Sequence, residues 1–239
     1  MNILIIGYGK MGHQIEEIST QRGHKIVDII DIDDNFEKVD NKAIDVAIEF
    51  TEPKSAVNNF MECFKRNIPL VSGTTGWYDN LPTIKEKVIN EKQTFLYSSN
   101  FSIGVYLFRK LNIYLAKMMD KYPSYLPSVT EIHHIHKKDA PSGTAITIAN
   151  DLLSNYHNIS SWKQDIKGDE KIMPVNSIRK GEEFGTHIVS YDSLCDVIEI
   201  KHKALNRKGL ASGAVMGAEF IKDKKGFFTM EDLMNSLDS

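Results

Sequence analysis

A segment in the second half of the chain concentrates side chains that can transfer protons and bind anions. It reads EIHHIHKKDAPSGTA from Glu131 to Ala145, and three of the eight histidines of the protein fall within four of its residues. An imidazole titrates near neutral pH, and a lysine ammonium is a compact positive charge. This density of titratable groups predicts a functional site in the segment. A cluster of solvated surface side chains is the alternative.

The end of this segment is typical of a helix start that binds an anion. Ser142 is a preferred N-cap residue, and the backbone N–H groups of Gly143 and Thr144 would lie in the first turn of the helix. The N-terminus of a helix carries a partial positive charge that favours a carboxylate. We therefore predict that this turn binds a substrate carboxylate, to which Lys137 adds a further charge.

The three histidines do not predict a metal site. Adjacent residues on a strand point to opposite faces, so His133 and His134 would not share one ion. In a fully extended chain, His133 and Lys137 would lie about 13 Å apart, at roughly 3.3 Å per residue. The chain must therefore bend between them, or the two side chains act at opposite ends of the substrate.

A glycine pattern near the N-terminus is typical of a loop that binds a dinucleotide. Gly7, Gly9 and Gly12 fit G-x-G-x-x-G between the apolar run 3–6 and an amphipathic helix. Asp31 lies 19 residues after Gly12, where a carboxylate can accept the ribose hydroxyls. The residues predicted to bind the dinucleotide here are Gly7, Gly9, Lys10, Met11, Gly12 and Asp31. The alternative is three turn glycines without a ligand.

A second glycine turn, Gly73-Thr74-Thr75-Gly76, directly follows the fourth expected strand. The carboxyl ends of parallel strands meet at one edge of an open sheet, and ligands bind there. Gly73, Thr74 and Thr75 are therefore predicted to contact the same cofactor. A polar turn without a ligand is the alternative.

The elements that must position these residues alternate between strand and helix in the first hundred residues. Short apolar runs typical of buried strands lie at residues 3–6, 26–30, 46–48, 70–71 and 95–97. Amphipathic helices are expected after Gly12, from Ser55 to Arg66 and from about Leu81 to Asn90. This alternation predicts an α/β fold with a doubly wound, Rossmann-like parallel sheet.

The pattern changes after Asn100 to that of a separate α+β domain. We expect an apolar helix from about Val105 to Met119, an extended segment from Val129 to Ile135, a helix led by Ser142, irregular chain from about Tyr156 to Pro174, and strands from Gly185 to Tyr191 and Leu194 to Lys203. Apolar and charged residues alternate in the last strand, as in a sheet with one wet face. From about Gly209 the chain is helical again, and a capping box is expected at Thr229.

Composition excludes several other classes of protein. The 239 residues are 41% apolar and 26% charged, as in ordinary globular proteins, and the net charge of −3 gives no positive field for nucleic acid or an anionic membrane. Cys63 and Cys195 form no metal-binding spacing and suit a reducing cytosol. No apolar run approaches the roughly 18 residues of a membrane span, and the N-terminus lacks a signal-peptide core. A cytoplasmic protein without nucleic-acid or membrane partners is expected.

These motifs resemble those of the dihydrodipicolinate reductase family of bacterial lysine and diaminopimelate synthesis. The family pattern E-x-H-H-x-x-K-x-D-A-P-S-G-T-A is met at every fixed position from Glu131 to Ala145. Further matches follow in the order of the family: Gly73 to Gly76, Ser99 to Val105, Ser177 to Gly181, Gly185 with His187, and His202 to Ala204. The resemblance spans most of the chain.

The resemblance implies a particular reaction. The protein would be an NAD(P)H-dependent oxidoreductase that acts on 4-hydroxy-tetrahydrodipicolinate and gives tetrahydrodipicolinate, with hydride transfer to C4 of the cyclic dicarboxylate left after loss of water. His133 would be the general acid/base. Lys137 would hold a substrate carboxylate and stabilise charge that develops during the reduction.

The resemblance also implies binding residues and domains. The anion site would be completed by His134, Ser142, Gly143 and Thr144. Asn100 and Phe101 would line a hinge near the nicotinamide, and Ser98 would also contact the cofactor. The implied domains are a dinucleotide-binding domain of residues 1–103 and 208–239 and a substrate-binding and tetramerisation domain of residues 104–207, whose mixed open sheet would assemble a homotetramer.

Two departures from the family pattern concern the choice of cofactor. The family loop is often G-x-x-G-x-x-G, one residue longer, and the residue after the ribose acid, often Arg, is Ile32 here. The 2′-phosphate of NADPH would be repelled by Asp31, Asp33 and Asp34. Lys10, inside the glycine loop, would offset part of this repulsion. We therefore expect both NADH and NADPH to be used, with NADH modestly preferred.

Two other interpretations of the sequence stay open. One is another two-domain NAD-dependent dehydrogenase that acts on amino or keto acids, because a fold alone does not fix the chemistry. The other is a nicotinamide-sensing module that binds the cofactor without turnover. A sensor has no need of the His133 and Lys137 pair.

Overall fold

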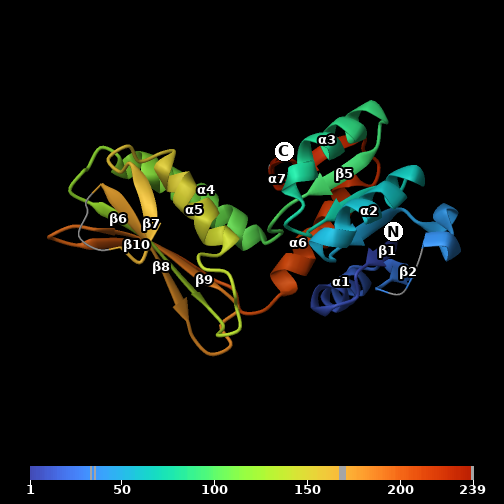
Figure 1. The fold of residues 1–239 in the computed structure, drawn as a ribbon, viewed down its shortest axis with the longest axis horizontal. Helices are drawn as coiled ribbons and strands as arrows, with labels where there is room; N and C mark the ends of the chain where they lie inside the picture. Colours follow the sequence, from blue (N-terminus) through green and yellow to red (C-terminus); the bar gives the residue numbers. More distant parts are fainter. Residues whose placement is uncertain (33, 35, 167–170, 238–239) are drawn as a thin grey trace. The chain divides into compact units, whose positions relative to one another are not determined.

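A computed structural model describes residues 1–32, 34, 36–166 and 171–237, and these residues form two compact units (Figure 1). Unit 1 comprises Met1–Ser102 and Arg207–Ser239, and unit 2 comprises Ile103–Asn206. Each boundary lies one residue from the one expected from the sequence. Asp33, one of the three acidic residues expected near the 2′-phosphate, lies outside the described residues.

Unit 1 is built on a six-stranded sheet in the order β11-β5-β4-β3-β1-β2, and every neighbouring pair is parallel. Its strands are β1 (Asn2–Ile6), β2 (Lys25–Ile30), β3 (Val46–Glu49), β4 (Leu70–Ser72), β5 (Thr94–Tyr97) and β11 (Gly226–Thr229). The doubly wound, Rossmann-like sheet is thus confirmed. The sequence did not predict β11, whose four residues lie between a lysine-rich turn and a helix.

The helices of unit 1 are α1 (Lys10–Gln21), α2 (Pro53–Lys65), α3 (Leu81–Asn90), α6 (Lys208–Ile221) and α7 (Met230–Asn235). Helix α2 begins two residues before the expected Ser55 because Pro53 occupies its first turn, where a proline is favoured. The expected capping box of α7 is present: the Thr229 side chain accepts the backbone N–H of Asp232, and the Asp232 side chain accepts the backbone N–H of Thr229. The helix ends before Leu237.

Helix α6 ties the last part of the chain to the sheet of unit 1. It contacts α1 and strands β3, β4 and β5. A Cβ atom at Gly213 would lie 1.8 Å from the carbonyl oxygen of Phe101, so only glycine permits this close approach. At the surface, Glu219 of α6 binds Arg22 and His24, each at 2.7 Å. The C-terminal segment from Arg207 therefore completes the fold of unit 1 and does not form a third unit.

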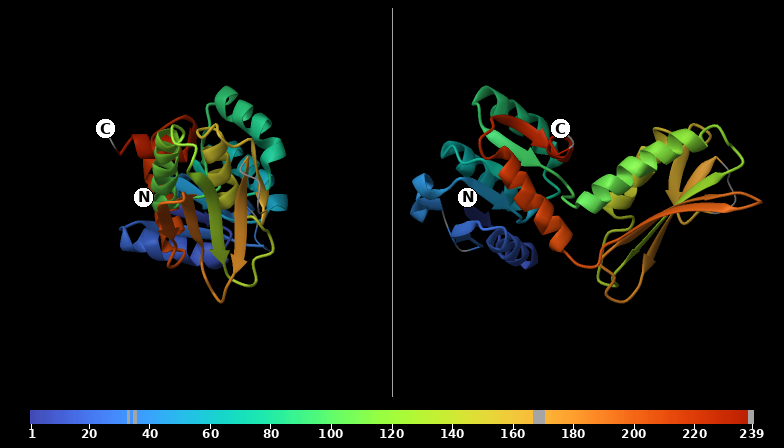
Figure 2. Two further views of the ribbon diagram at one scale, coloured as in Figure 1. Left: turned by 90° about the vertical axis from the view of Figure 1, so that its left-hand side faces the viewer. Right: turned by 180° about the vertical axis from the view of Figure 1, so that it is seen from behind.

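Unit 2 has a five-stranded mixed sheet in the order β10-β9-β6-β8-β7. Its strands are β6 (Leu126–His133), β7 (Ser161–Gln164), β8 (Ile172–Arg179), β9 (Thr186–Asp192) and β10 (Val197–Lys203), and its helices are α4 (Ile103–Met119) and α5 (Gly143–Leu153). Strands β6, β8 and β7 are parallel, whereas β9 pairs antiparallel with β6 and β10. The expected mixed open sheet is confirmed. Figure 2 shows α4 and α5 together on one face of it.

Two expectations for unit 2 are wrong. The stretch from Tyr156 to Pro174 is not irregular throughout, because it contains β7 and the start of β8. Strand β7 is short, polar and at the sheet edge, so its sequence carries little apolar alternation. The last strand begins at Val197 rather than Leu194, because Ser193 closes a tight turn by accepting hydrogen bonds from the backbone of Cys195 and Asp196.

Strand β6 carries the residues of the sequence motif to the helix-covered side of the sheet. Its residues alternate between buried and partly exposed, and both Glu131 and His133 lie on the buried side. In register, Glu131 stands between Ser177 of β8 and His187 of β9. The sheet therefore brings together three polar side chains that are far apart in the sequence.

No helix among the described residues is long and apolar enough to cross a membrane.

Candidate active site

Close packing around the glycine loop of unit 1 requires residues without a side chain at two positions. Gly7 has a φ of +90°, and a Cβ atom there would lie 2.1 Å from the carbonyl oxygen of Phe50. A Cβ atom at Gly12 would lie 2.4 Å from the carbonyl oxygen of Gly7. Gly9 is the N-cap of α1 and provides no side chain to cap it. The first-turn N–H groups of α1, where Lys10 and Met11 lie, thus have the geometry that binds a phosphate.

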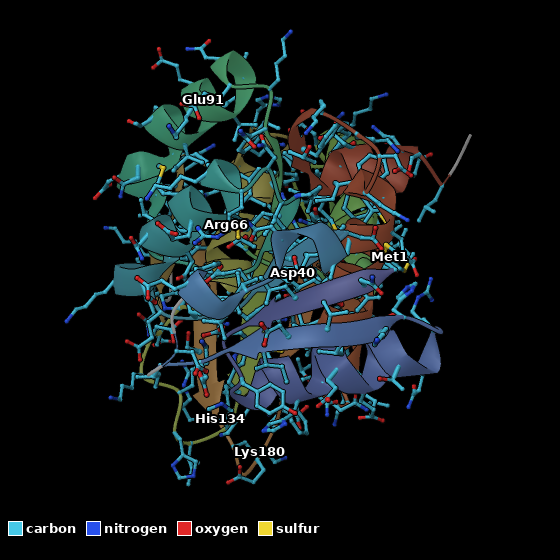
Figure 3. All side chains as sticks on the ribbon, turned by 90° about the vertical axis from the view of Figure 1, so that its right-hand side faces the viewer. Met1, Asp40, Arg66, Glu91, His134 and Lys180 are labelled. Carbon is cyan, nitrogen blue, oxygen red and sulfur yellow. The ribbon has the colours of Figure 1, made fainter. Side chains whose placement is uncertain are left out.

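A cavity of about 780 Å³ opens beside this loop and is lined entirely by unit 1. Asp31 lies at the loop, since the backbone N–H of Tyr8 donates to its Oδ1 at 3.3 Å. The lining also includes Arg66, the C-cap residue of α2, which is labelled in Figure 3. The structure therefore brings Asp31 to the glycine loop, as the motif requires. Lys10 is exposed on α1 and is not among the lining residues.

Arg66 is a basic residue of this cavity that the sequence motifs did not reveal. It comes from the C-terminal end of α2, so its place depends on the packing of α2 on the sheet. Its guanidinium pairs with Glu62, stacks over the ring of Phe36 at 5.2 Å and donates to the carbonyl oxygen of Phe36 at 3.3 Å. Its charge is therefore partly neutralised within the cavity wall.

The second glycine turn lies against the same part of the sheet. A Cβ atom at Gly73 would lie 2.1 Å from the ring of Phe50, so this position requires glycine. Thr74 is buried, and its hydroxyl donates to Glu49 at 2.8 Å and accepts the backbone N–H of Thr51 at 2.7 Å. The Thr74 side chain therefore braces the turn, and Thr75 is the exposed side chain of the pair.

Glu49 is a second residue that sequence reasoning missed. It is fully buried at the end of β3 and also accepts hydrogen bonds from Ser72, at 2.6 Å, and from Thr51. Burial raises the pKa of Glu49, while these hydrogen bonds oppose the rise. The one sequence signal was a carboxylate directly after a buried apolar strand. Its role is to join the ends of β3 and β4.

The three residues expected near the nicotinamide have different surroundings. Ser98 and Asn100 form a turn after β5, in which the Ser98 hydroxyl donates to the Asn100 carbonyl oxygen at 2.7 Å. The Asn100 side chain accepts the backbone N–H of Ser102 at 2.9 Å. Phe101 is 1% exposed and packs against Phe50 and α6. A contact of Phe101 with a cofactor would therefore involve its backbone rather than its ring.

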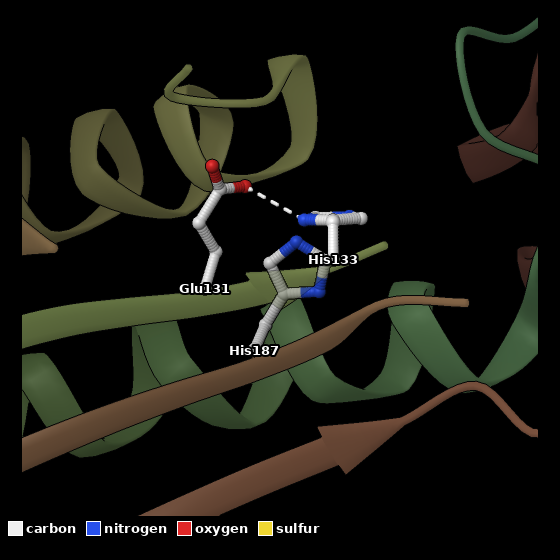
Figure 4. A group of neighbouring side chains, drawn as sticks. All are labelled: Glu131, His133 and His187. Atoms are coloured by element: carbon white, nitrogen blue, oxygen red, sulfur yellow. Dashed lines mark ion pairs between the residues drawn. The ribbon is translucent and has the colours of Figure 1, made fainter. Parts of the chain in front are cut away.

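In unit 2, the pairing register brings an ion pair and a second imidazole together (Figure 4). Nδ1 of His133 lies 3.2 Å from Oε2 of Glu131, at ion-pair distance although not aligned as a good hydrogen bond. The rings of His133 and His187 meet edge to face at 5.3 Å. Gly185 leaves room for the imidazole, since a Cβ atom there would lie 3.1 Å from Nε2 of His133. The predicted acid/base residue is thus held in a buried polar cluster.

The electrostatics of this cluster fix two protonation states. Burial alone would raise the pKa of Glu131, but the neighbouring His133 imidazole and hydrogen bonds from Ser142 and Ser177 bring it well below its usual value. Burial, and then the positive charge of His133, lower the pKa of His187 to about 4. At neutral pH, Glu131 is therefore an anion and His187 is neutral.

The chain bends directly after His133, as the sequence required. The backbone N–H of Lys180 donates to the His133 carbonyl oxygen at 2.8 Å, and that of Lys137 donates to the His134 carbonyl oxygen at 3.2 Å. His134 and Lys180, both labelled in Figure 3, thus lie on adjacent loops. The Lys137 ammonium binds both carboxylate oxygens of Asp139, at 2.7 and 2.8 Å.

The predicted helix start is also present. Ser142 is the N-cap of α5, and its hydroxyl accepts the backbone N–H of Ala145 at 3.1 Å. Gly143 and Thr144 form the first turn, as expected. His133 therefore lies where the loop begins, Lys137 lies within the loop, and the predicted anion-binding turn lies where the loop ends.

One set of described side chains has the geometry to hold a metal ion. The ligand atoms of Glu131, His133 and His187 all lie within 4.8 Å of one another. The sequence predicts no metal site from His133 and His134, and it does not indicate this set. Glu131 and His187 stood in the family motifs without a role, and only the strand register brings them together. The Glu131 carboxylate already faces Arg179 at 3.5 Å, an arrangement that suits proton transfer at His133.

The fold and the site define a class of protein. Unit 1 has the parallel sheet, glycine loop and acidic residue of a dinucleotide-binding unit, and unit 2 has an acid/base cluster beside a helix N-terminus. This combination is that of the two-domain nicotinamide-dependent oxidoreductases.

Family models identify the particular family. The model described as "Dihydrodipicolinate reductase, N-terminus" matches residues 1–101, and "Dihydrodipicolinate reductase, C-terminus" matches residues 104–234. The chain belongs to the dihydrodipicolinate reductase family. It is 47% identical over 237 residues to a protein of Christiangramia forsetii named 4-hydroxy-tetrahydrodipicolinate reductase, covering 99% of both chains.

Solved structures agree on the fold. A dihydrodipicolinate reductase from Paenisporosarcina sp. TG-14, solved with dipicolinate bound, superposes with a TM-score of 0.74 at 22% identity and covers 96% of this chain and 97% of that one. DAP dehydrogenase from C. glutamicum superposes with a TM-score of 0.51 at 12% identity, over 96% and 92% of the two chains. The fold is thus shared with other two-domain dehydrogenases, and the family match separates this chain from them.

Proposed function

We propose that this chain catalyses the NAD(P)H-dependent reduction of 4-hydroxy-tetrahydrodipicolinate to tetrahydrodipicolinate in lysine and diaminopimelate biosynthesis. The observation that carries the proposal is the buried Glu131–His133 pair at the base of a loop that carries Lys137 and leads into α5. This loop offers a proton donor and an anion site for a cyclic dicarboxylate. A location in the cytoplasm belongs to the same proposal.

The residues of unit 2 are assigned their roles from the electron flow. Reduced nicotinamide supplies a hydride to C4 of the unsaturated ring that remains after the substrate loses water. The electrons of the reduced double bond move toward the ring nitrogen, and a proton must then reach the carbon beside C4. We assign delivery of this proton to His133. The ionised Glu131 at Nδ1 favours the protonated imidazole before transfer.

The substrate carboxylates call for positive charge. Lys137 and the first turn of α5, with Gly143 and Thr144, bind one carboxylate, and His134 lies on the same loop. Asp139 holds the Lys137 ammonium in place until the substrate arrives. The same ammonium stabilises negative charge that develops on the ring during hydride addition.

The nucleotide is assigned to unit 1. The phosphates are bound by the glycine loop and the start of α1, with Gly7, Gly9, Lys10, Met11 and Gly12. The ribose hydroxyls are bound by Asp31. The residues assigned to the nicotinamide half are Gly73, Thr74, Thr75, Ser98, Asn100 and Phe101, the buried ones among them through their backbone.

A direct assay tests the proposed function. The protein is mixed with NADH and freshly generated 4-hydroxy-tetrahydrodipicolinate, and the nicotinamide absorbance is followed. Loss of absorbance that depends on substrate is expected. Binding of NADH without such loss would identify a nicotinamide-sensing module instead.

The first prediction for this activity concerns the cofactor. NADH should be used better than NADPH, because the described lining of the cavity presents five carboxylates, Asp31, Asp34, Glu37, Glu52 and Glu62, against one basic residue, Arg66, itself paired with Glu62. At about 6 Å and an effective dielectric between 20 and 80, each unit pair of like charges costs about 1 to 3 kcal/mol. A preference of up to about tenfold in kcat/KM is therefore expected.

Two variants locate the determinant. Lys10→Ala should lower kcat/KM for NADPH selectively if Lys10 reaches the 2′-phosphate, and Arg66→Ala is the matched control for the basic residue inside the cavity. A wild-type preference for NADPH of tenfold or more that disappears in Arg66→Ala would contradict the assignment and make Arg66 the phosphate ligand.

The second prediction concerns assembly. We propose a homotetramer that forms through the sheet of unit 2, because α4 and α5 cover one face of this sheet, while Ile132 and its neighbour Ile178 lie on the other. Ile178 is 44% exposed, which is unusual for an isoleucine in the middle of a sheet. Light scattering should give about 108 kDa, four times the chain mass of 27.1 kDa.

The control for assembly is a change on this face. Ile178→Asp should lower the measured mass while leaving NADH binding by unit 1 intact. A wild-type mass of a single chain across micromolar concentrations would rule out the proposed assembly.

A further inference from the structure

Glu131 lies where two proposed functions of unit 2 meet, proton transfer by His133 and anion binding at the start of α5. We propose that Glu131 is a positioning residue whose one buried carboxylate both orients His133 and anchors the N-cap of α5. The proton donor and the carboxylate-binding turn are then held in a fixed relation. The roles of these groups rest on the proposed function, whereas the contacts of Glu131 do not.

The contact with α5 is direct. The backbone N–H of Ser142 donates to both carboxylate oxygens of Glu131, at 3.1 Å each. Ser142 is the N-cap residue whose hydroxyl holds the backbone N–H of Ala145. Glu131 lies two residues before the end of β6, where the loop begins, and Ser142 is the residue at which the loop ends. The carboxylate therefore closes the loop at its base.

The contact with His133 involves the same carboxylate. Oε2 of Glu131 lies 3.2 Å from Nδ1 of His133, and Nδ1 is buried without a hydrogen-bond partner among the described residues. An anion at this distance stabilises the imidazolium and favours a proton on Nδ1 in the neutral ring. The Nε2 atom, which faces Gly185, is then the atom that exchanges a proton with the substrate.

Glu131 is itself held from β8. The Ser177 hydroxyl donates to its Oε1 at 2.8 Å, and the Arg179 guanidinium lies 3.5 Å from the same oxygen. Arg179 also donates to the backbone carbonyl oxygens of Asp139, at 2.6 Å, and Lys137, at 3.4 Å. A side chain with zero exposure and this many partners has one available position. Such rigidity is what a positioning residue requires.

The charged and titratable groups around His133 come from all elements packed against it. They are Glu131 of β6, His187 of β9, Arg179 of β8, His202 of β10, and Lys137 and Asp139 of the loop. Glu131 is the anion at ion-pair distance from the His133 ring, and Asp139 is paired with Lys137. Removal of the Glu131 charge should therefore have a larger effect on His133 than removal of any other group in the set.

The decisive variants are Glu131→Gln and Glu131→Ala. Gln keeps an oxygen that accepts the Ser142 N–H but removes the charge, so kcat should fall about 10- to 100-fold with KM for the substrate within about threefold. The loss should fall on kcat rather than on KM, because the His133 ring loses the anion that orients it while the anion-binding turn keeps its anchor. Ala removes both functions and should also raise KM, since the N-cap loses its anchor.

Two measurements do not depend on turnover. NMR of the His133 ring nitrogens should show the neutral ring protonated on Nδ1 in wild type and a mixture of both tautomers in Glu131→Gln. Calorimetry with dipicolinate should show wild-type affinity in Glu131→Gln and at least tenfold weaker binding in Glu131→Ala. NADH binding should be equal in all three proteins, which confirms that they are folded. A wild type without reductase activity would refute the proposed function while leaving these two readouts valid.

Ser177→Ala is the matched control, because it removes one hydrogen bond to Glu131 and leaves the charge. It should lower kcat by about threefold, less than Glu131→Gln does, because the charge of Glu131 and its contact with Ser142 remain. If Glu131→Gln has the wild-type kcat and the wild-type His133 tautomer, Glu131 does not position His133. If Ser177→Ala reproduces the full effect of Glu131→Gln, the effect is one of packing and the proposal is overturned.

Discussion

Replacement of His133 by glutamine is expected to lower kcat by about 10²- to 10⁴-fold, the usual contribution of a positioned acid/base. Glutamine is close in size to histidine and fits between Glu131 and His187, but its amide does not exchange a proton near neutral pH. NADH binding should change little, because the dinucleotide is assigned to unit 1. Steady-state rates and NADH dissociation constants, measured on the same preparation, check both expectations.

The control for this variant lies three residues away. His136 is exposed and pairs with the exposed Glu182 at 3.4 Å. His136→Gln therefore removes an imidazole from the same loop without touching the cluster, and its kcat should match wild type. Equal turnover in wild type and His133→Gln would show that the proton comes from another group.

Replacement of Lys137 by alanine should be comparably damaging, with a different pattern. The ammonium is proposed to bind a carboxylate in the ground state and to stabilise charge in the transition state, so KM should rise and kcat should fall. A loss of about 10²-fold or more in kcat/KM is expected. The measurement is the full substrate dependence of the rate at saturating NADH.

Lys138→Ala is the matched control for Lys137. Lys138 is the next residue and is exposed, so its removal changes the net charge equally without altering the loop. Its kinetic constants should stay near those of wild type. If the Lys137 and His133 variants both keep wild-type turnover, the assigned roles are wrong and family membership carries only the fold.

Features set by local sequence could be predicted. The glycine loop, the first five strands of unit 1 and the N-cap at Ser142 each depend on residues within a few positions of one another. Gly7 illustrates this, because a short apolar run followed by glycine is enough to predict a tight turn after a buried strand. The structure confirms this turn. A side chain at Gly7 would collide with Phe50, at the end of the neighbouring strand β3, so the turn requires glycine.

Features set by strand register could not be predicted. Glu131, Ser177 and His187 come together because β6 pairs with β8 on one side and β9 on the other, in one particular register. No spacing within the sequence encodes that register. Strand β7 was missed for a related reason, since a short polar edge strand is defined by the partner it pairs with.

Arg66 shows the same limit in unit 1. Its position on α2 was part of a correctly expected helix, but only the packing of α2 places its guanidinium in the cavity wall. The sequence predicts the cofactor preference from the acidic residues after β2, with Lys10 of the glycine loop as the opposing charge. The structure adds Arg66, a second basic residue, from a part of the chain distant from the glycine loop.

The central claim is that this chain transfers a hydride to C4 of a cyclic dicarboxylate with a proton supplied by unit 2. Its most direct test uses NADH that carries deuterium at the transferred position, with freshly generated 4-hydroxy-tetrahydrodipicolinate and enough enzyme for complete conversion. We expect the loss of one NADH per substrate molecule and a product with one deuterium at C4. The His133→Gln variant should form this product far more slowly. No loss of NADH, or deuterium at a carbon other than C4, would contradict it.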